Sequence, residues 1–323
     1  MTEQPDLKTL IRRLEKRHQK RQAATALIAG TGVLGIMVLV APLLAKPEAL
    51  PLVTEAPAAA IMAVAPDAFD GVVIEGKAAI VYDLATGEAL YEKNSRSQLP
   101  LASLTKLLTV YAAHEALRPG DIVTITESSL RPEGDSGFVL GERFRFGDLA
   151  RFALVTSSND ATAAIAEAAA SAKGVTGKDL LANAADSLGL AQTYALNGTG
   201  LDESLSVSGA YGSARDVAVL AGALRAAAPE VADATTFAAS SVTSLEGFSH
   251  SLPNTNQQIV RIPNALLSKT GFTDLAGGNL AVVYDAGMGH PVAVVVLGSS
   301  REGRFSDVAA LIARADRYFA GTR

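Results

Sequence analysis

The segment "LPLASLTKLLTVYAAHEALRPG" spans residues 99–120 and has two polar residues, Ser103 and Lys106, at the start of an apolar run. The run predicts a helix that begins after Ser103 and ends before Pro119-Gly120. Residues i and i+3 share a face in the first turn of a helix, so the serine hydroxyl and the lysine amine can meet. Taken alone, the pair has two interpretations: a helix cap beside a solvated lysine, or a nucleophile beside its base.

A lysine in the first turn opposes the helix dipole, which disfavours the capping interpretation. The positive helix terminus and partial burial would also lower the pKa of the amine, and a neutral amine can accept the serine proton. Two distant motifs bear on the choice. The segment "TSSND" places Ser157 and Asn159 at a break between two expected helices. The segment "SKTGF" opens an expected strand with Lys269-Thr270-Gly271.

Each distant motif also has a purely structural interpretation, a helix cap for the first and a turn into an edge strand for the second. Together, in the order S-x-x-K, S-x-N and K-T-G, the three motifs form the set found in penicillin-binding proteins and class A β-lactamases. Chance production of all three in this order and spacing is improbable. The joint pattern therefore favours a nucleophile and its base at residues 103 and 106.

The similarity extends beyond the motifs to whole blocks of sequence, among them "VLGERFRFGDLARFALVTSSND" (139–160), "LPNTNQ" (252–257) and "LLSKTGFTDLAGGNLAVV" (266–283). Over roughly residues 75–320 the chain resembles the serine-type D-Ala-D-Ala carboxypeptidases, the low-molecular-mass penicillin-binding proteins of peptidase family S11. The resemblance implies an α+β fold of the β-lactamase/transpeptidase type. In this fold an antiparallel sheet is flanked by helices, with an all-helical subdomain.

The resemblance also implies roles for individual residues. Ser103 is the expected nucleophile, Lys106 its general base, and Ser157 the relay that protonates the leaving amine. Asn159 is expected to bind the substrate backbone and to hold Lys106. The backbone amides of Ser103 and Phe272 are the expected oxyanion hole. The remaining expected substrate-binding residues are Lys269, Thr270, Gly271 and Arg304.

Two positions keep alternatives open. Arg304, in "REGRFSD", is expected either to pair with the substrate carboxylate or to be a solvated surface arginine, and Arg301 is near enough in sequence to take the first role. Ser158 stands at the centre of the S-x-N motif, where the family often has glycine. A side chain this small should be tolerated there.

The implied activity is release of the terminal D-Ala from peptidoglycan stem pentapeptides through a Ser103 acyl-enzyme, a step in cell-wall and cell-shape maintenance, with β-lactam antibiotics as covalent inhibitors. A D,D-endopeptidase that cuts peptide cross-links would use the same residues and remains an alternative. A class A β-lactamase is disfavoured, because Ala168–Ser171 follow Glu167 without an E-x-x-x-N pattern. A non-catalytic cell-wall binding protein is disfavoured, because every catalytic position holds a competent residue.

The composition argues against several other classes. The chain has 323 residues, no cysteine and a formal net charge of −5, which excludes thiol catalysis and disulfides and disfavours nucleic-acid binding. The four histidines form no H-E-x-x-H pair, so neither a metal nor a cofactor is predicted. Gly30, Gly32 and Gly35 spell a dinucleotide fingerprint, but they lie in an apolar span without the strand that the fingerprint needs.

The N-terminal part predicts a membrane protein. Residues 1–22 form a basic segment, and residues 23–45 carry no charge and are long enough to cross a bilayer. The positive-inside rule then places the N-terminus in the cytoplasm and the rest of the chain outside, in single-pass topology at the bacterial inner membrane. A cleaved signal peptide is the alternative. Residues 46–72, rich in Pro and Ala, are the expected linker to a catalytic domain at 73–323.

The pattern of apolar residues predicts strands at both ends of the catalytic domain and helices between them. A hairpin is expected at 77–94, and three strands are expected at 264–272, 278–286 and 291–299. These distant segments should join in one sheet. The expected helices after the Ser103 helix cover residues 148–155, 160–170, 177–188, 213–226 and 305–319.

Overall fold

The computed structural model describes residues 68–321. The expected basic segment at 1–22, the expected membrane span at 23–45 and most of the expected linker therefore lie outside the described residues. Within residues 68–321, no helix combines the length and the apolar character that a membrane crossing needs.

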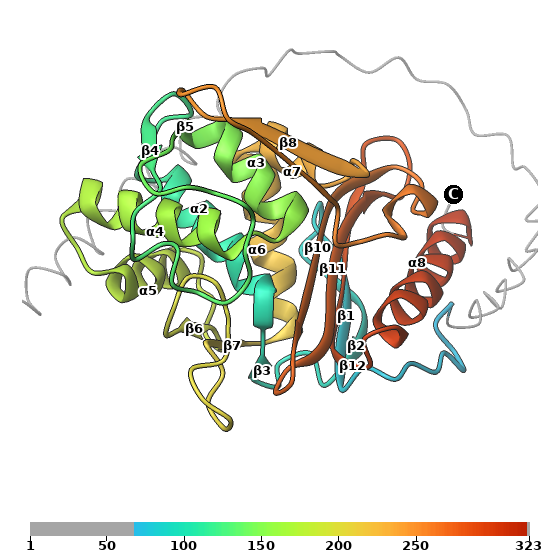
Figure 1. Ribbon diagram of the computed structural model, residues 1–323. Coiled ribbons are helices and arrows are strands. Elements are labelled where there is room, and N and C mark those ends of the chain that lie inside the picture. The colour runs from blue at the N-terminus through green and yellow to red at the C-terminus, as the bar shows by residue number, and fades with distance from the viewer. Residues whose placement is uncertain (1–67, 322–323) are drawn as a thin grey trace, which may run out of the picture. The chain divides into compact units, whose positions relative to one another are not determined.

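A five-stranded antiparallel sheet forms the centre of the domain (Figure 1). Its strand order is β10-β11-β12-β1-β2, so the last strands of the sequence pair with the first, as the sequence predicts. The pairing of β1 with β12 runs from Ala78 opposite Leu297 to Asp83 opposite Val292. The strands are β1 (Ala78–Asp83), β2 (Ala89–Lys93), β10 (Ala265–Thr273), β11 (Gly277–Asp285) and β12 (Pro291–Ser299).

Both faces of this sheet are covered, which explains the uninterrupted apolar run of β12. Val292, Val294 and Val296 belong to a core on one face, whereas Ala293, Val295 and Leu297 belong to a core on the other face. This alternation follows from the period of two along a strand. A strand buried on both faces needs apolar residues at every position.

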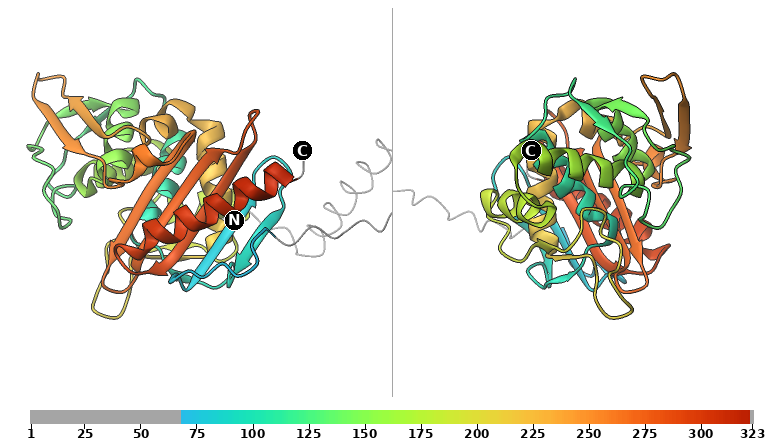
Figure 2. Two further views of the ribbon diagram at one scale, coloured as in Figure 1. Left: turned by 90° about the vertical axis from the view of Figure 1, so that its right-hand side faces the viewer. Right: turned by 60° about the vertical axis from the view of Figure 1, so that its left-hand side comes forward.

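Helix α8 (Gly303–Gly321) covers one face of the sheet and crosses it obliquely (Figure 2). It buries Val308, Leu311, Ile312 and Ala315, the i, i+3, i+4, i+7 spacing of an amphipathic helix. The other helices lie on the opposite face of the sheet (Figure 1). They are α2 (Thr105–His114), α3 (Phe146–Thr156), α4 (Asn159–Lys173), α5 (Gly177–Ser187), α6 (Ala214–Ala227) and α7 (Pro229–Ala234).

Helix α2 is the core of the helical part. Eight of its ten residues are buried, and it packs against α3, α4, α5 and α6. A helix that is surrounded in this way is buried on nearly all sides, which agrees with its mostly apolar sequence. The 3-10 helix η1 (Ala102–Leu104) precedes it directly. The position of Ser103 is therefore fixed by the tertiary packing of α2.

Several short elements complete the domain, and the hairpin β8–β9 and helix α7 were not among the elements expected from the sequence. In β8 and β9, exposed residues, most of them small and polar, alternate with more buried ones. The apolar pattern that predicts a strand is therefore weak in this part of the sequence. The short elements are β3 (Leu99–Pro100), β4 (Ile122–Thr124), β5 (Arg143–Arg145), β6 (Tyr194–Ala195), β7 (Ala210–Gly212), β8 (Ala239–Thr243), β9 (Ser249–Pro253) and the 3-10 helix η2 (Ile259–Arg261).

The packed domain begins before residue 73, the boundary expected from composition. Phe69 is 5% exposed and stacks on Tyr91 of β2, with ring centroids 5.5 Å apart. Its side chain belongs to the core between the sheet and α8. The expected linker therefore ends ahead of Phe69, because a buried aromatic ring is part of the fold and not of a tether.

Candidate active site

Ser103 and Lys106 meet in the way that their spacing predicts. The Lys106 Nζ lies 2.8 Å from the Ser103 Oγ, and it also donates to the Thr199 carbonyl oxygen at 2.8 Å. Lys106 is completely buried, whereas Ser103 is partly exposed. The Ser103 side chain caps neither η1 nor α2, so the capping interpretation is wrong.

The surroundings of Lys106 prepare its amine for proton transfer. Burial lowers the pKa of Lys106 to about 7, because a buried ammonium loses its hydration. Near neutral pH a large fraction of this amine is therefore uncharged. An uncharged amine 2.8 Å from a hydroxyl can accept its proton as the hydroxyl attacks an electrophile.

A second serine and lysine lie at the same place. The Lys269 Nζ donates to the Ser157 Oγ and to the Thr270 carbonyl oxygen, both at 2.8 Å. Burial lowers the pKa of Lys269 well below its usual value, and the positive charges of Lys106 and Arg304 lower it further. The structure thus brings two buried lysines and two serines together from η1, α2, the C-terminal end of α3 and β10.

Backbone geometry presents Ser157 to the site. Ser157 follows the last residue of α3 and has a left-handed φ of 60°. The next residue, Ser158, already precedes the first residue of α4. The Ser158 hydroxyl accepts from the Ala161 amide and is the N-terminal cap of α4. Ser158 also accepts a hydrogen bond from the Ser136 hydroxyl at 2.7 Å. The central serine of the motif is therefore structural.

Asn159 is placed differently from the expectation that it holds Lys106. Its Nδ2 donates to the Glu133 carbonyl oxygen at 2.5 Å, and its buried Oδ1 has no hydrogen-bond partner among the described residues. The second acceptor for Lys106 is the carbonyl of Thr199. Every residue has a backbone carbonyl, so the side chain of Thr199 does not indicate this contact. The sequence offers only the segment "NGTG" (197–200) as a sign of it.

Strand β10 approaches the nucleophile closely at Gly271. A Cβ atom on Gly271 would lie 2.8 Å from the Leu101 carbonyl oxygen and 3.3 Å from the Leu104 amide nitrogen. Asn279 on the neighbouring strand donates to the same Leu101 oxygen at 3.0 Å. Sequence reasoning missed Asn279, although a buried Asn inside the apolar run of β11 is an unusual choice.

Arg304 is buried at 8% exposure, so its interpretation as a solvated surface residue is wrong. Its Nη1 donates to the Gly271 carbonyl oxygen at 2.7 Å, while its buried Nε has no partner among the described residues. Arg301 is exposed, and its guanidinium lies 3.7 Å from the ring centre of Phe272. Both arginines line the same cleft.

The cleft has two parts of opposite charge. The part of about 440 Å³ contains Ser103, Ser157, Thr270, Arg301 and Arg304. A larger part, of about 1070 Å³, shares Phe272 with it and also contains Asn159 and Thr199. This larger part has five acidic residues and, among the described residues that line it, no basic one. The acidic residues are Glu133, Glu167, Asp202, Glu203 and Asp274.

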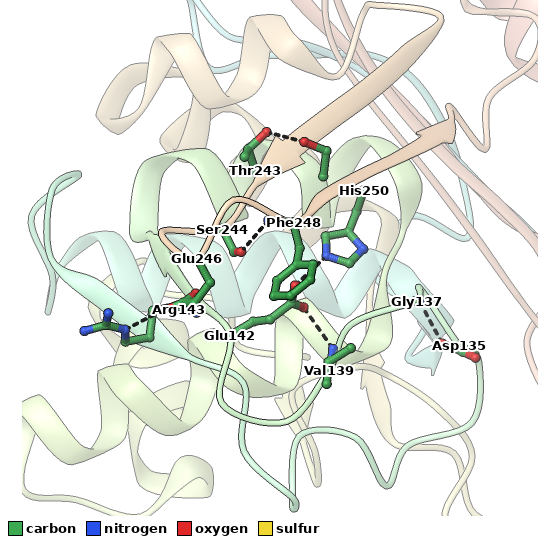
Figure 3. Close-up of polar contacts among 11 residues, drawn as sticks. Asp135, Gly137, Val139, Glu142, Arg143, Thr243, Ser244, Glu246, Phe248 and His250 are labelled. Carbon is green, nitrogen blue, oxygen red and sulfur yellow. Dashed lines mark hydrogen bonds and ion pairs between the residues drawn. The ribbon is translucent and has the colours of Figure 1, made fainter.

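The loop between β4 and β5 forms one wall of the larger part of the cleft, and the β8–β9 hairpin holds this loop (Figure 3). His250 Nε2 lies 3.0 Å from the buried Oε1 of Glu142, whose Oε2 accepts from the Val139 amide at 2.9 Å. Arg143 and Glu246 form an ion pair at 2.7 Å beside it. The hairpin thus supports the loop whose Glu133 carbonyl orients Asn159.

Comparison with known proteins gives this geometry a context. Residues 62–301 match the family model described as D-alanyl-D-alanine carboxypeptidase, peptidase S11. The chain is 30% identical over 247 residues to the D-alanyl-D-alanine carboxypeptidase DacF of Bacillus subtilis, covering 74% of this chain and 61% of that protein. It is 31% identical over 246 residues to DacD of Escherichia coli, covering 72% and 61%.

A solved structure shares the fold. Penicillin-binding protein D2 of Listeria monocytogenes, in its ampicillin-bound form, matches with a TM-score of 0.64 and 28% sequence identity, over 75% of this chain and 98% of that chain. This match confirms the expected α+β fold. The chain spans about 61% of the length of the two curated relatives.

Proposed function

Because the chain belongs to the D-alanyl-D-alanine carboxypeptidase family, peptidase S11, we propose that it is a serine-type D-alanyl-D-alanine carboxypeptidase acting on peptidoglycan stem pentapeptides. The observation that carries this proposal is the 2.8 Å contact between Ser103 Oγ and the buried Lys106 amine, whose pKa is about 7. A serine becomes a nucleophile near neutral pH when a base in this state takes its proton.

In the acylation step, Ser103 Oγ attacks the carbonyl carbon of the penultimate D-Ala, and its proton passes to Lys106. The contact reverses its direction in this step: the protonated amine donates to the serine, whereas the neutral amine accepts from it. The negative charge that forms on the substrate carbonyl oxygen is stabilised by the backbone amides of Ser103 and Phe272. Gly271 supports this role, because it allows β10 to lie against the nucleophile turn.

The amide bond then breaks and the terminal D-Ala leaves with its nitrogen protonated. Ser157 relays this proton: its hydroxyl protonates the nitrogen and regains a proton from Lys106, which leaves Lys106 neutral for the next step. Lys269, which lies 2.8 Å from the Ser157 Oγ, stabilises the serine as the proton moves. A water molecule attacks the acyl-enzyme with Lys106 again as base, which frees the shortened peptide and restores Ser103.

The charge of the cleft orients the substrate. Arg301 and Arg304 bring positive charge to the smaller part of the cleft, which one carboxylate, Glu302, also lines, and the terminal carboxylate of the peptide binds there beside Lys269. Arginine suits this task because its planar guanidinium can donate two parallel hydrogen bonds to a carboxylate. The preceding residues of the peptide then extend past Asn159 into the larger part of the cleft.

Covalent labelling tests this proposal. The wild-type protein should react with a fluorescent penicillin and release D-Ala from a pentapeptide, and Ser103→Ala should do neither. A wild type without labelling and without D-Ala release would overturn the proposal. Products from muropeptides identify the reaction: free D-Ala from pentapeptide monomers indicates a carboxypeptidase, whereas monomers released from cross-linked dimers indicate the endopeptidase alternative.

The same proposal includes location and inhibition. Residues 23–45 anchor the enzyme in the cytoplasmic membrane with residues 1–22 inside, residues 46–67 act as the tether, and the catalytic domain works outside. Ampicillin bound to the Listeria monocytogenes protein supports β-lactams as covalent inhibitors. Alkaline extraction of membranes and mass spectrometry of the N-terminus separate an anchored chain from one with a cleaved signal peptide.

A further inference from the structure

The turn at residues 197–200, between β6 and β7, lies along one face of helix α2. The Thr199 carbonyl oxygen accepts from Lys106 Nζ at 2.8 Å, and the neighbouring Gly198 carbonyl oxygen accepts from Thr109 Oγ1 at 2.7 Å. Residues 106 and 109 are three apart, so they share a face of the helix. Two successive backbone carbonyls of the turn therefore bond this face, and one of them contacts the proposed base.

Gly200 brings the turn against the nucleophile. It has a left-handed φ of 76°, and a Cβ atom on it would overlap the carbonyl oxygen of Ala102, the residue before Ser103. The same Cβ atom would lie 2.6 Å from Thr105 Oγ1. Glycine allows both the backbone conformation and the close approach. The turn is thus packed directly against the segment that holds Ser103.

Asn197 holds this turn through its side-chain amide. Its Oδ1 accepts from the Thr199 hydroxyl and from the backbone amides of Thr199 and Gly200, at 2.8–3.1 Å. Its Nδ2 donates to the Leu201 carbonyl oxygen at 3.0 Å and to Glu203 Oε1 at 2.7 Å. Asparagine is favoured in turns because its side chain can accept such local backbone bonds. Here the bonds fix the turn from both sides.

The bond from the Gly200 amide sets the direction of the Thr199 carbonyl, because both belong to the same peptide group. The N–H and C=O of a trans peptide point in opposite directions. With the N–H held on Asn197 Oδ1 at 2.8 Å, the carbonyl points away from Asn197 and reaches Lys106 Nζ, also at 2.8 Å. The side chain of Asn197 thus determines which backbone carbonyl Lys106 meets.

The same turn separates Lys106 from the cleft. Residues 197–199 line the larger part of the cleft, whereas Lys106 behind them is completely buried. Burial is the cause that lowers the pKa of Lys106 to about 7. Lys269 on β10 is the charged group that interacts with this amine, and Glu203 lies on the cleft side of the turn. The turn therefore controls both the hydration of the amine and the position of one of its hydrogen-bond partners.

From these contacts we infer that Asn197 is a positioning residue for the Ser103–Lys106 pair: its side-chain amide holds the turn in the orientation in which a backbone carbonyl binds the lysine. This inference rests on the proposed function and deepens it. The hydrogen bonds of the Asn197 side chain go to residues 199–203, so it acts through the turn and not on the reacting atoms. With the turn fixed, the amine keeps its direction toward Ser103 Oγ and stays shielded from water in the cleft.

Asn197→Ala removes these side-chain bonds and should change acylation by penicillin in two ways. The plateau rate at high pH should fall about 10- to 100-fold, because the amine loses its alignment. The half-point of the pH profile should rise by about one pH unit, because a hydrated ammonium is more stable than a buried one. Loss of the carbonyl acceptor acts in the opposite direction on the pKa of Lys106, but burial is the dominant cause, so the rise prevails.

Stopped-flow labelling with a fluorescent penicillin between about pH 5 and 10 measures the plateau and the half-point. Asn197→Ser should recover part of both, because a serine hydroxyl accepts the same local backbone bonds more weakly.

Asp285→Ala is the matched control. Like Asn197 Oδ1, the Asp285 carboxylate accepts three hydrogen bonds within a turn, from the backbone amides of Gly287, Gly289 and His290. It stands at the turn between β11 and β12 and lines neither part of the cleft. The substitution should lower the melting temperature and leave the acylation profile as in the wild type.

A purely structural Asn197 gives a different result. Asn197→Ala would then resemble Asp285→Ala, with a lower melting temperature and an unchanged half-point in the folded protein. An unchanged half-point overturns the inference, whatever happens to the plateau. If Asn197→Ala does not fold, Asn197→Ser decides: a lower plateau with a raised half-point supports the inference, and a wild-type profile overturns it.

A direct measurement on Lys106 separates this inference from the proposed function. With isotope-labelled lysine, NMR titration of the Lys106 Cε signal, assigned with Lys106→Arg, should show a pKa about one unit higher in Asn197→Ala than in the wild type. If the wild type neither reacts with penicillin nor releases D-Ala, the proposed function fails, and this shift still supports Asn197 as the residue that positions Lys106. The same Lys106 pKa in both proteins overturns the inference, even in an active enzyme.

Discussion

Gly271 and Leu101 lie in contact, although 170 residues separate them: a Cβ atom on Gly271 would stand 2.8 Å from the Leu101 carbonyl oxygen. Leu101 precedes the turn that presents Ser103, and Gly271 follows Lys269 and Thr270 on β10. The distance between the nucleophile and the second lysine therefore depends on the absence of a side chain at residue 271. A strand can come this close to another backbone only at glycine.

Gly271→Ala should consequently separate β10 from the nucleophile turn. We expect the rate of acylation by penicillin to fall by about 100-fold or more, because a displacement on the order of 1 Å removes catalytic alignment. The free energy of unfolding should fall by about 1–3 kcal/mol through overpacking. Stopped-flow labelling and urea unfolding measure the two effects.

Gly177→Ala is a suitable control for this substitution. Gly177 begins α5, and a Cβ atom there meets nothing within 4 Å. It should leave acylation unchanged and slightly stabilise the fold, because alanine favours the helix. Equal acylation rates in Gly271→Ala and the wild type would show that the close approach is unimportant for alignment.

The pH dependence of acylation should follow Lys106. Its pKa is about 7, and the amine must be neutral to accept the Ser103 proton. Below pH 7 the amine is protonated, so the acylation rate should fall about tenfold for each pH unit; above pH 7 the rate should level off. The second-order rate of penicillin labelling between about pH 5 and 9 measures this profile.

Lys106→Arg provides the control for the pH profile, because a guanidinium keeps its proton throughout this range. It should be inactive at every pH. A wild-type profile that stays flat through pH 7, or an active Lys106→Arg variant, would show that another group is the base.

The sequence allowed the sheet and the four central site residues to be predicted, because both depend on patterns of residue type. Alternating or continuous apolar runs mark β1, β11 and β12, and the three motifs mark Ser103, Lys106, Ser157 and Lys269. The contacts of Lys106 and Asn159 with the carbonyls of Thr199 and Glu133 were not predicted. Every residue has a carbonyl, so only tertiary packing decides which one reaches the site.

The burial of Arg304 could not be predicted from the sequence either, because it also depends on tertiary packing. An arginine in the segment "REGRFSD" is typical of a solvated turn, and only the packing of α8 on β11 and β12 places its guanidinium at the Gly271 carbonyl. The β8–β9 hairpin gave a weak signal because exposed small polar residues dominate its pattern. Tertiary context, not local preference, forms both features.

Substitution of the two arginines should separate binding from stability. Arg304→Ala removes the donor to the buried Gly271 carbonyl, so it should lower the free energy of unfolding by about 1–3 kcal/mol and also raise KM for the pentapeptide. Arg301→Ala affects an exposed residue, so it should raise KM with little change in stability. Urea unfolding and steady-state kinetics measure both. The same loss of stability in the two variants would contradict this assignment.

His250 should stabilise the cleft wall through Glu142. Glu142 is 3% exposed, and His250→Ala leaves its Oε1 buried without a partner; we expect a loss of about 2–3 kcal/mol in the free energy of unfolding. Activity should fall as well, because the same loop orients Asn159 through Glu133.

A double-mutant cycle with Glu142→Gln, measured by urea unfolding, isolates the contact between residues 142 and 250. His250→Ala should lower the free energy of unfolding by less when residue 142 is uncharged. An equal cost in both backgrounds would mean that the ring packing against Phe138, and not the polar contact, carries the effect.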